Sequence, residues 1–403
     1  MNLKRFLPVI SLCVSLSYAQ ISYYSSYGFG IASPSLPVKL LAMGYGGVAV
    51  SDTFSLNTMN PALWAHFPTT SLQGQMSSSL LQVDKLDYRS SANEFMGFSI
   101  KFPISKRTGI ALGVHPETRI SATKSVTDST EFGDLYVPYK FTTDANGGIS
   151  SFFFGGGFQL RDNLYLGIQA KLLFGEILVE RSTDIDIDDN DDGYFKRAEE
   201  IRGTQVGVGA AWSDRTNRTK IGLSYERSLR FRTRARYDYT FGPDTTFDFR
   251  TLKYPSNLRI GFSSIFWNKL LISADFSLTS IDKSIFQKFY LFEPVASKDS
   301  YGFGLGIERQ SEYKYQSSFW KQLSLRGGFY FKTAPFYNSK RVEERGVTLG
   351  LGVPFGAFRN RIDLAVVLAK RNGFLQAVGD ENILSFHIGI TTGEVWFRRV
   401  RRY

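Results

Sequence analysis

The residues of this 403-residue chain with the clearest capacity for chemistry form an acidic run near its middle. Asp188, Asn190 and Asp192 alternate along the run, a glycine follows, and Glu199 comes after five more residues. The spacing matches the calcium loop D-x-[DN]-x-[DN]-G-x5-E, in which the residue after the glycine, here Tyr194, adds its carbonyl oxygen. The run therefore predicts a Ca²⁺ site. A solvated acidic loop without a metal is the alternative.

Four arginines, Arg230, Arg232, Arg234 and Arg236, alternate with other residues and so share one face of an extended strand. Their face continues the polar series that ends at Ser228, which indicates that they point to the polar side of the sheet. Guanidinium groups there are candidates for binding an anionic headgroup, because each can donate two parallel hydrogen bonds to a carboxylate. Pairing with acids of the same chain is the alternative.

Other functional classes are disfavoured by what the sequence lacks. Cys13 is the single cysteine, no G-x-S-x-G string occurs, and the three histidines are far apart. No catalytic constellation and no histidine or cysteine metal site is therefore evident, and no cofactor is required. The 48 Lys and Arg residues outnumber the 37 Asp and Glu, but they are scattered rather than gathered on one element. The sequence therefore predicts neither an enzyme nor a nucleic-acid-binding protein.

The elements that must position these residues are strands. From about residue 69 onward the apolar residues alternate with polar ones in fourteen segments, and the connections between the segments are short and long in turn. Trp212, Trp267, Trp320 and Trp396 fall beside short connections or at the end of the chain. Because a soluble sandwich has no reason for either asymmetry, we predict an all-β fold: a 14-stranded antiparallel transmembrane β-barrel of the bacterial outer membrane, with the long loops outside.

The chain divides into four parts on this interpretation. Residues 1–19 have the basic, apolar and small-residue regions of a cleaved signal peptide. Residues 20–67 do not alternate and predict a partly helical hatch inside the lumen. Residues 68–398 form the barrel, and residues 399–403 form a basic periplasmic tail. Both ends of the mature chain are expected on the periplasmic side.

The hatch contains two motifs, a glycine cluster at Gly44, Gly46 and Gly47 and the tripeptide Asn60, Pro61 and Ala62. Glycines allow tight turns and close approach to the wall, and Pro61 restricts its own backbone and that of Asn60. The two motifs and the glycine-rich C-terminal strands resemble the FadL/TodX family of outer-membrane transporters of hydrophobic compounds. The resemblance implies that ligand binding shifts the Asn60–Ala62 region to open a path. A plain helix start at Pro61 is the alternative.

We therefore expect a channel that takes up hydrophobic or amphipathic small molecules, similar to long-chain fatty acids, through a gated hatch. Its partners would be the ligand and the surrounding outer-membrane lipid and lipopolysaccharide. The alternative is a non-transporting barrel that serves as a scaffold for exported proteins, similar to PorV of type IX secretion, and a third reading is an open porin. An apolar pocket beside the hatch favours transport, a sealed lumen favours a scaffold, and a wet pore favours a porin.

Overall fold

A computed structural model describes residues 22–33, 36–65, 69–85, 88–132, 135–185, 193–240, 242–267, 269–312, 318–356, 360–375 and 379–394. None of the helices in these ranges is long and apolar enough to cross a membrane. The calcium ligands Asp188, Asn190 and Asp192, the signal peptide and the basic tail lie outside the described residues.

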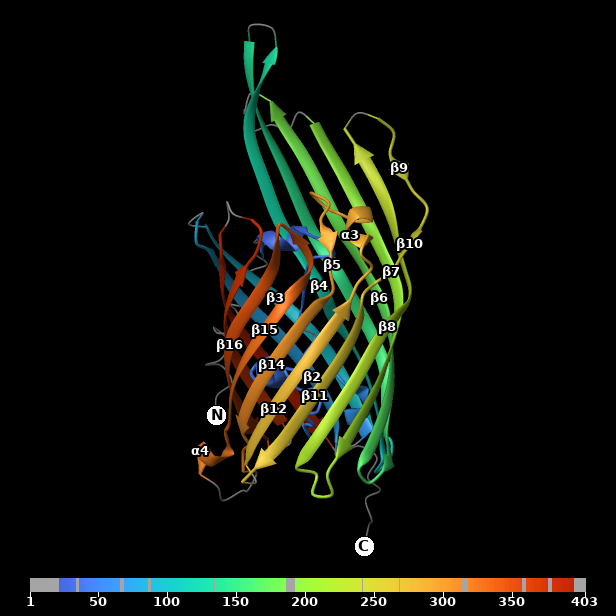
Figure 1. Cartoon of the computed structure of the whole chain (residues 1–403), viewed down its shortest axis with the longest axis vertical. Coiled ribbons are helices and arrows are strands. Elements are labelled where there is room, and N and C mark those ends of the chain that lie inside the picture. The colour runs from blue at the N-terminus through green and yellow to red at the C-terminus, as the bar shows by residue number, and fades with distance from the viewer. Residues whose placement is uncertain are drawn as a thin grey trace.

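Fourteen of the described strands form a closed antiparallel barrel, as the alternation predicts (Figure 1). Each strand pairs with its neighbour, and β18 pairs with β2 from Glu381 opposite Val83 to Glu394 opposite Thr70, which closes the ring. The barrel strands are β2 (Thr70–Val83), β3 (Tyr88–Pro103), β4 (Thr108–Phe132), β5 (Leu135–Arg161), β6 (Leu164–Ile185), β7 (Gly193–Ser213), β8 (Thr219–Tyr239), β11 (Ser256–Phe266), β12 (Leu270–Ser280), β14 (Ser300–Arg309), β15 (Ser324–Asn338), β16 (Lys340–Phe355), β17 (Asn360–Asn372) and β18 (Glu381–Glu394).

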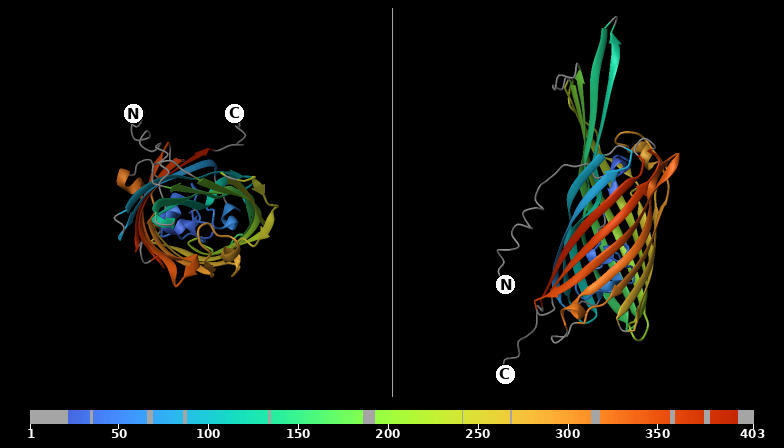
Figure 2. Two further views of the ribbon diagram at one scale, coloured as in Figure 1. Left: turned by 90° about the horizontal axis from the view of Figure 1, so that it is seen from above. Right: turned by 90° about the vertical axis from the view of Figure 1, so that its left-hand side faces the viewer.

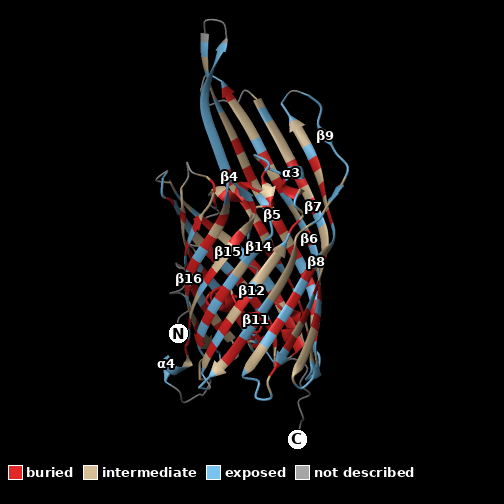
Figure 3. Ribbon diagram, in the orientation of Figure 1, coloured by how far each residue is buried: buried red, intermediate tan, exposed pale blue. Residues whose placement is uncertain are grey.

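Apolar side chains cover the outside of the barrel. On β2, Leu72, Met76 and Leu80 are exposed, whereas Gln73 and Gln75 are buried inside, and the same alternation of exposed and buried residues runs along the other strands (Figure 3). A surface of this kind is stable only where lipid rather than water covers it.

The two ends of the barrel differ. The turn end carries short connections, such as that between β5 and β6 at residues 162–163, and the loop end carries long ones. The connection elements are β9 (Thr245–Thr246), β10 (Arg250–Leu252), α3 (Ile285–Lys288), β13 (Ala296–Ser297) and α4 (Phe319–Gln322). Strands β4 to β8 are about twice as long as β11 and β12 and extend far beyond the rest of the rim at the loop end (Figure 1).

The N-terminal segment lies inside the ring of strands (Figure 2). It contains η2 (Tyr23–Ser26), β1 (Ile31–Ala32), α2 (Val38–Leu41) and η3 (Pro61–Ala65). We name residues 22–33 the strap and residues 36–65 the hatch floor. The Ser22 hydroxyl donates to Glu381 at 2.7 Å, where β18 begins at the loop end. The expectation that the N-terminal end lies at the turn end is therefore wrong, because the strap first runs along the loop end and only then descends to the floor.

Bulges interrupt the hydrogen-bonded ladder between the strands. The alternation of apolar and polar residues in the sequence does not reveal them. The register between β7 and β8 shifts between Thr204 and Gln205, so one extra residue of β8, Leu229, has no partner. A single extra residue reverses which side chains face the lumen beyond it. A second bulge lies on β3, where Met96 is an extra residue between the partners of Gln75 and Met76 of β2.

Candidate functional site

The hatch floor approaches the barrel wall at the glycine cluster. Gly44 has a backbone φ of +69°, its amide donates to the Thr348 hydroxyl at 3.0 Å, and it lies against the backbones of β14 and β15. The Val48 amide donates to the Asp275 carboxylate at 2.7 Å. A side chain at position 44 would be strained and would collide with the wall, so glycine is required there.

Asn60 joins the two halves of the hatch floor to the wall. Its side-chain amide donates to the carbonyl of Val48 at 3.0 Å and to that of Ala210 in β7 at 3.1 Å, and its carbonyl accepts from the Ala62 amide. The 3-10 turn that begins at Pro61 is completely buried against β5, β6 and β7. The two predicted hatch motifs are thus brought together through Val48.

The strands that face the Asn60–Ala62 segment carry glycines at the points of contact. A Cβ on Gly157 or Gly167 would overlap the backbone of Pro61, and one on Gly209 would overlap the Asn60 side chain. The alternating pattern of the sequence predicts only that these glycines face the lumen. Their function in the structure is to let a helical turn pack directly on the sheet.

A buried network of six charges also holds the floor. It contains three cations and three carboxylates: Lys39, Asp52, Glu308, Arg326, Arg361 and Asp363. Arg361 bridges Asp52 at 2.5 Å and Asp363 at 2.8 Å, and Lys39 bridges Glu308 at 2.9 Å. Two members belong to the floor and four to β14, β15 and β17, so the network joins the floor to the barrel with balanced charge.

Burial by itself would raise the pKa of Asp52, the network's carboxylate on the hatch floor. The Arg361 guanidinium and the Lys39 ammonium outweigh burial and hold the pKa of Asp52 well below its usual range. The carboxylate is therefore ionised at every physiological pH. This network is not predicted from the sequence, although Glu308, Arg326, Arg361 and Asp363 stand at lumen-facing positions of the alternating pattern.

A chamber of about 360 Å³ lies between the strap and the hatch floor. Aromatic rings of Phe29, Tyr254, Phe286 and Phe336 line one part of it. Phe29 in the strap packs within 5.5 Å of Phe286 in α3, measured between ring centroids. The volume falls within the range of roughly 300–1,000 Å³ typical of small-molecule sites.

The opposite part of the chamber is charged. Lys171 of β6 pairs with Glu117 and with Glu226, at 3.2 Å in each case, and Arg259 of β11 pairs with Glu226 at 3.2 Å. The chamber therefore presents an aromatic region beside a compact set of paired charges, which is an environment suited to an amphipathic molecule.

The barrel wall is incomplete between β3 and β4. These strands pair only from Phe98 opposite Val114 to Pro103 opposite Gly109, although both continue for many residues toward the loop end. We name the unpaired stretch the seam. Two side chains bridge it among the described residues: the His115 ring contacts the Met96 carbonyl at 3.2 Å, and Arg119 donates to the Phe95 carbonyl at 3.4 Å. Bulges at Met96 of β3 and at Glu117 of β4 lie just beyond the last pair, Phe98 opposite Val114. We attribute the seam to them, because a bulge bends its strand and disrupts the ladder.

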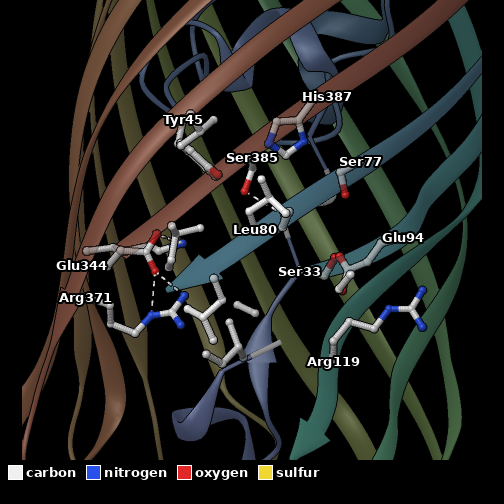
Figure 4. A pocket seen from close by; sticks show the side chains of 18 of the residues that line it. Ser33, Tyr45, Ser77, Leu80, Glu94, Arg119, Glu344, Arg371, Ser385 and His387 are labelled. Carbon is white, nitrogen blue, oxygen red and sulfur yellow. Dashed lines mark hydrogen bonds and ion pairs between the residues drawn. The ribbon is translucent and has the colours of Figure 1, made fainter. Parts of the chain in front are cut away.

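The strap lies across the seam from inside. Ile31 and Ala32 of β1 pair with Arg119 and Thr118 of β4, and Ala32 remains exposed. A pocket of about 90 Å³ behind the seam shares Ile31, Ala32 and Ser33 with the chamber (Figure 4).

The outer face of the wall is hollowed beside the same pocket. A depression of about 930 Å³ covers β2, β3 and β15 to β18. It shares Leu80, Leu81, Ser90 and Ile383 with the inner pocket, so single side chains separate the two.

The arginine prediction is wrong in its direction. The bulge at Leu229 reverses the two faces of β8 beyond it. The side chains buried inside this part of β8 are Phe231, Thr233 and Ala235. The alternate arginines Arg230, Arg232, Arg234 and Arg236 therefore lie on the outer face of the barrel and cannot receive a headgroup in the lumen.

The structure also separates the two predicted calcium ligands that it describes, Tyr194 and Glu199. Gly193–Ser213 is one continuous strand, so Glu199 lies about 20 Å along β7 from Gly193, at roughly 3.3 Å per residue. Its carboxylate is buried beside Arg197 and Arg250, whereas Tyr194 is exposed near the strand end. Glu199 therefore cannot close a calcium loop of the expected form, and the described residues contain no cluster of three metal-binding side chains.

A closed 14-stranded barrel with its N-terminal segment folded inside defines a class, the FadL-like barrels of the bacterial outer membrane. Within this class, the chain belongs to the BamG family, whose model matches residues 1–403. A comparison with curated proteins finds no match.

Several solved structures share the fold. The chain is similar to the CymD monoaromatic hydrocarbon channel (TM-score 0.60, 12% identity, 92% of this chain and 100% of that one). It is also similar to the toluene transporter TbuX of Ralstonia pickettii (TM-score 0.58, 15% identity, 91% and 98%) and to a FadL homologue of Pseudomonas aeruginosa (TM-score 0.57, 13% identity, 93% and 99%). At these identities the similarity establishes the fold alone.

Proposed function

We propose that this barrel takes a hydrophobic or amphipathic small molecule from the loop end into the chamber and releases it sideways through the seam. The observation that carries the proposal is the seam itself, where β3 and β4 lose their hydrogen bonds beside a lumen pocket. A wall without backbone hydrogen bonds can open at low cost, whereas a complete ladder cannot.

The hatch floor favours this lateral route over passage through the hatch. Polar side chains of β2, β11, β12 and β16, together with the six-charge network, hold the floor at many points. Moving the Asn60–Ala62 segment would break the hydrogen bonds of Asn60 and separate packed backbone from the wall glycines. We therefore assign the gate to the seam and a sealing function to the floor.

Deleting Met96 tests the lateral route. The deletion removes the extra residue of β3, so the strand should straighten and pair with β4 over a longer stretch. We expect proteoliposomes to take up a fluorescent long-chain fatty acid from albumin at least about tenfold more slowly than with the wild type. Ala32→Trp, which fills the seam from the strap, should slow uptake in the same direction.

Deletion of Leu160 provides the matched control, because the register shift between Gln159 and Arg161 leaves Leu160 as the extra residue of a bulge near the turn end. This variant should transfer the probe at the wild-type rate. Heat-modifiable mobility on gels would show whether the Met96 deletion and Ala32→Trp are folded. If both folded variants took up the probe at the wild-type rate, lateral release would be refuted.

A scaffold function is the second candidate, and the long β4–β8 wall supports it. Beyond β1, no described strand pairs with β4 on its seam side, although the Ser25 hydroxyl bonds the backbone of Ser121. The part of this edge that no strand covers could pair with a strand of another protein. If the wild-type barrel transfers neither a fatty acid nor a monoaromatic hydrocarbon, the scaffold becomes the better account.

A further inference from the structure

An arginine-rich surface covers the outside of β7 and β8. Arg202 of β7 lies directly opposite Arg232 of β8, Glu200 opposite Arg234, and Thr204 opposite Arg230. Neighbours two residues apart on one strand are about 7 Å apart. We name the set Arg202, Arg230, Arg232, Arg234 and Arg236 the arginine surface.

The arginine surface begins where the apolar outer face ends. On β8 the exposed apolar side chains nearer the turn end are Ile221, Leu223, Tyr225 and Leu229, with one exposed arginine, Arg227, among them. The arginine surface follows immediately. Across the sheet, Arg202 pairs on its other side with Phe174 of β6, an exposed apolar residue. An apolar face of about 25 Å marks the hydrocarbon in barrels of this kind, so the arginines stand at the headgroup level of the loop-end leaflet.

The arginine surface carries more cations than the neighbouring carboxylates neutralise. Glu200 pairs with both Arg202 and Arg234, and the Phe249 ring lies under the same two guanidinium groups, 5.6 Å and 4.8 Å from its centroid. These two arginines are thereby held in place. Arg230 and Arg232 form no ion pair within the described part of the chain.

We infer that the arginine surface binds the phosphate groups of a phosphorylated glycolipid in the outer leaflet. Guanidinium groups bind phosphate with two parallel hydrogen bonds, and two unneutralised arginines about 7 Å apart can hold one or two phosphates. The apolar side chains directly below would contact the acyl chains of the same molecule. A free anion would use the arginines but not this wall, so a lipid is the better occupant.

Arg230→Gln combined with Arg232→Gln tests the inference in the full-length barrel. The probe is diphosphoryl lipid A, added in detergent and followed by native mass spectrometry. We expect the fraction of barrel with bound lipid to fall at least about tenfold relative to the wild type, and dephosphorylated lipid A to bind both proteins equally weakly. Arg230→Lys with Arg232→Lys keeps the charge but loses the paired donors, so it should retain intermediate binding.

Arg215→Gln with Arg218→Gln is the matched control, because both arginines are exposed in a turn-end connection. This variant should bind lipid A as the wild type does. Equal retention by the wild type and the Arg230/Arg232 variant would overturn the inference and would point to neutralisation of the arginines by acids of the chain itself. Displacement of the lipid by millimolar inorganic phosphate would likewise overturn the choice of a lipid. Neither outcome bears on transport.

Discussion

Replacing Arg361 by Leu should release the hatch floor from the barrel and open a conductive path. The substitution leaves Asp52 and Asp363 buried without their shared cation, a change that typically costs about 3–5 kcal/mol. In planar bilayers we expect the wild type to be closed and Arg361→Leu to show steady ion conductance. Trypsin should also cleave the floor of the variant faster. Arg309→Leu is the control, since this exposed side chain donates to the carbonyls of Trp320 and Leu323 near the turn end.

The same network predicts the pH dependence of the closed state. A carboxyl whose pKa is lowered in the folded protein contributes stability above its unfolded pKa of about 3.9, and that contribution is lost as the pH falls through the lowered value. Because the pKa of Asp52 is lowered, the barrel should stay closed from about pH 5 to pH 8 and conduct only below about pH 4. Opening near pH 6 would contradict this account of the network.

Replacing Gly167 by Val should displace the hatch floor without preventing barrel formation. A side chain there would overlap the backbone of Pro61 and Ala62, which cannot move aside while Asn60 remains bound to the Ala210 carbonyl. We expect conductance and rapid proteolysis of the floor, as with Arg361→Leu. The control is Gly74→Val, because nothing lies within 4 Å of a Cβ at position 74. A closed, protease-resistant Gly167→Val barrel would show that the wall glycines are dispensable for packing.

Much of this fold could be predicted from the sequence because lipid enforces the alternation. The strands, the asymmetry of the connections and the exposed tryptophans Trp212, Trp267 and Trp320 follow from that constraint and are confirmed. The glycine cluster and the Asn60–Ala62 motif lie inside the lumen, as predicted. The gate function predicted for them is untested, and the proposed lateral route gives them a sealing function instead.

Bulges account for most of what could not be predicted. A bulge is a single extra residue with no compositional signature, yet Leu229 reverses the face of every arginine after it and Met96 separates β3 from β4. The sequence also could not predict which residues pair in the six-charge network. A polar residue on an alternating strand indicates only that its side chain faces the lumen. Which of these residues meet depends on the register of strands far apart in the chain, as for Asp52 and Arg361.

Photolabelling with a diazirine-bearing long-chain fatty acid tests the central claim most directly, because it marks the path of the molecule in the unmodified barrel. After irradiation of wild-type proteoliposomes, the labelled residues are identified by mass spectrometry of peptides. The proposed route predicts label on the chamber ring Phe286, on the adjacent Tyr254 and on the seam residue Ala32, with none on Asn60–Ala62. Label concentrated on Asn60–Ala62 and absent from Ala32 would contradict the lateral route and would place the path through the hatch.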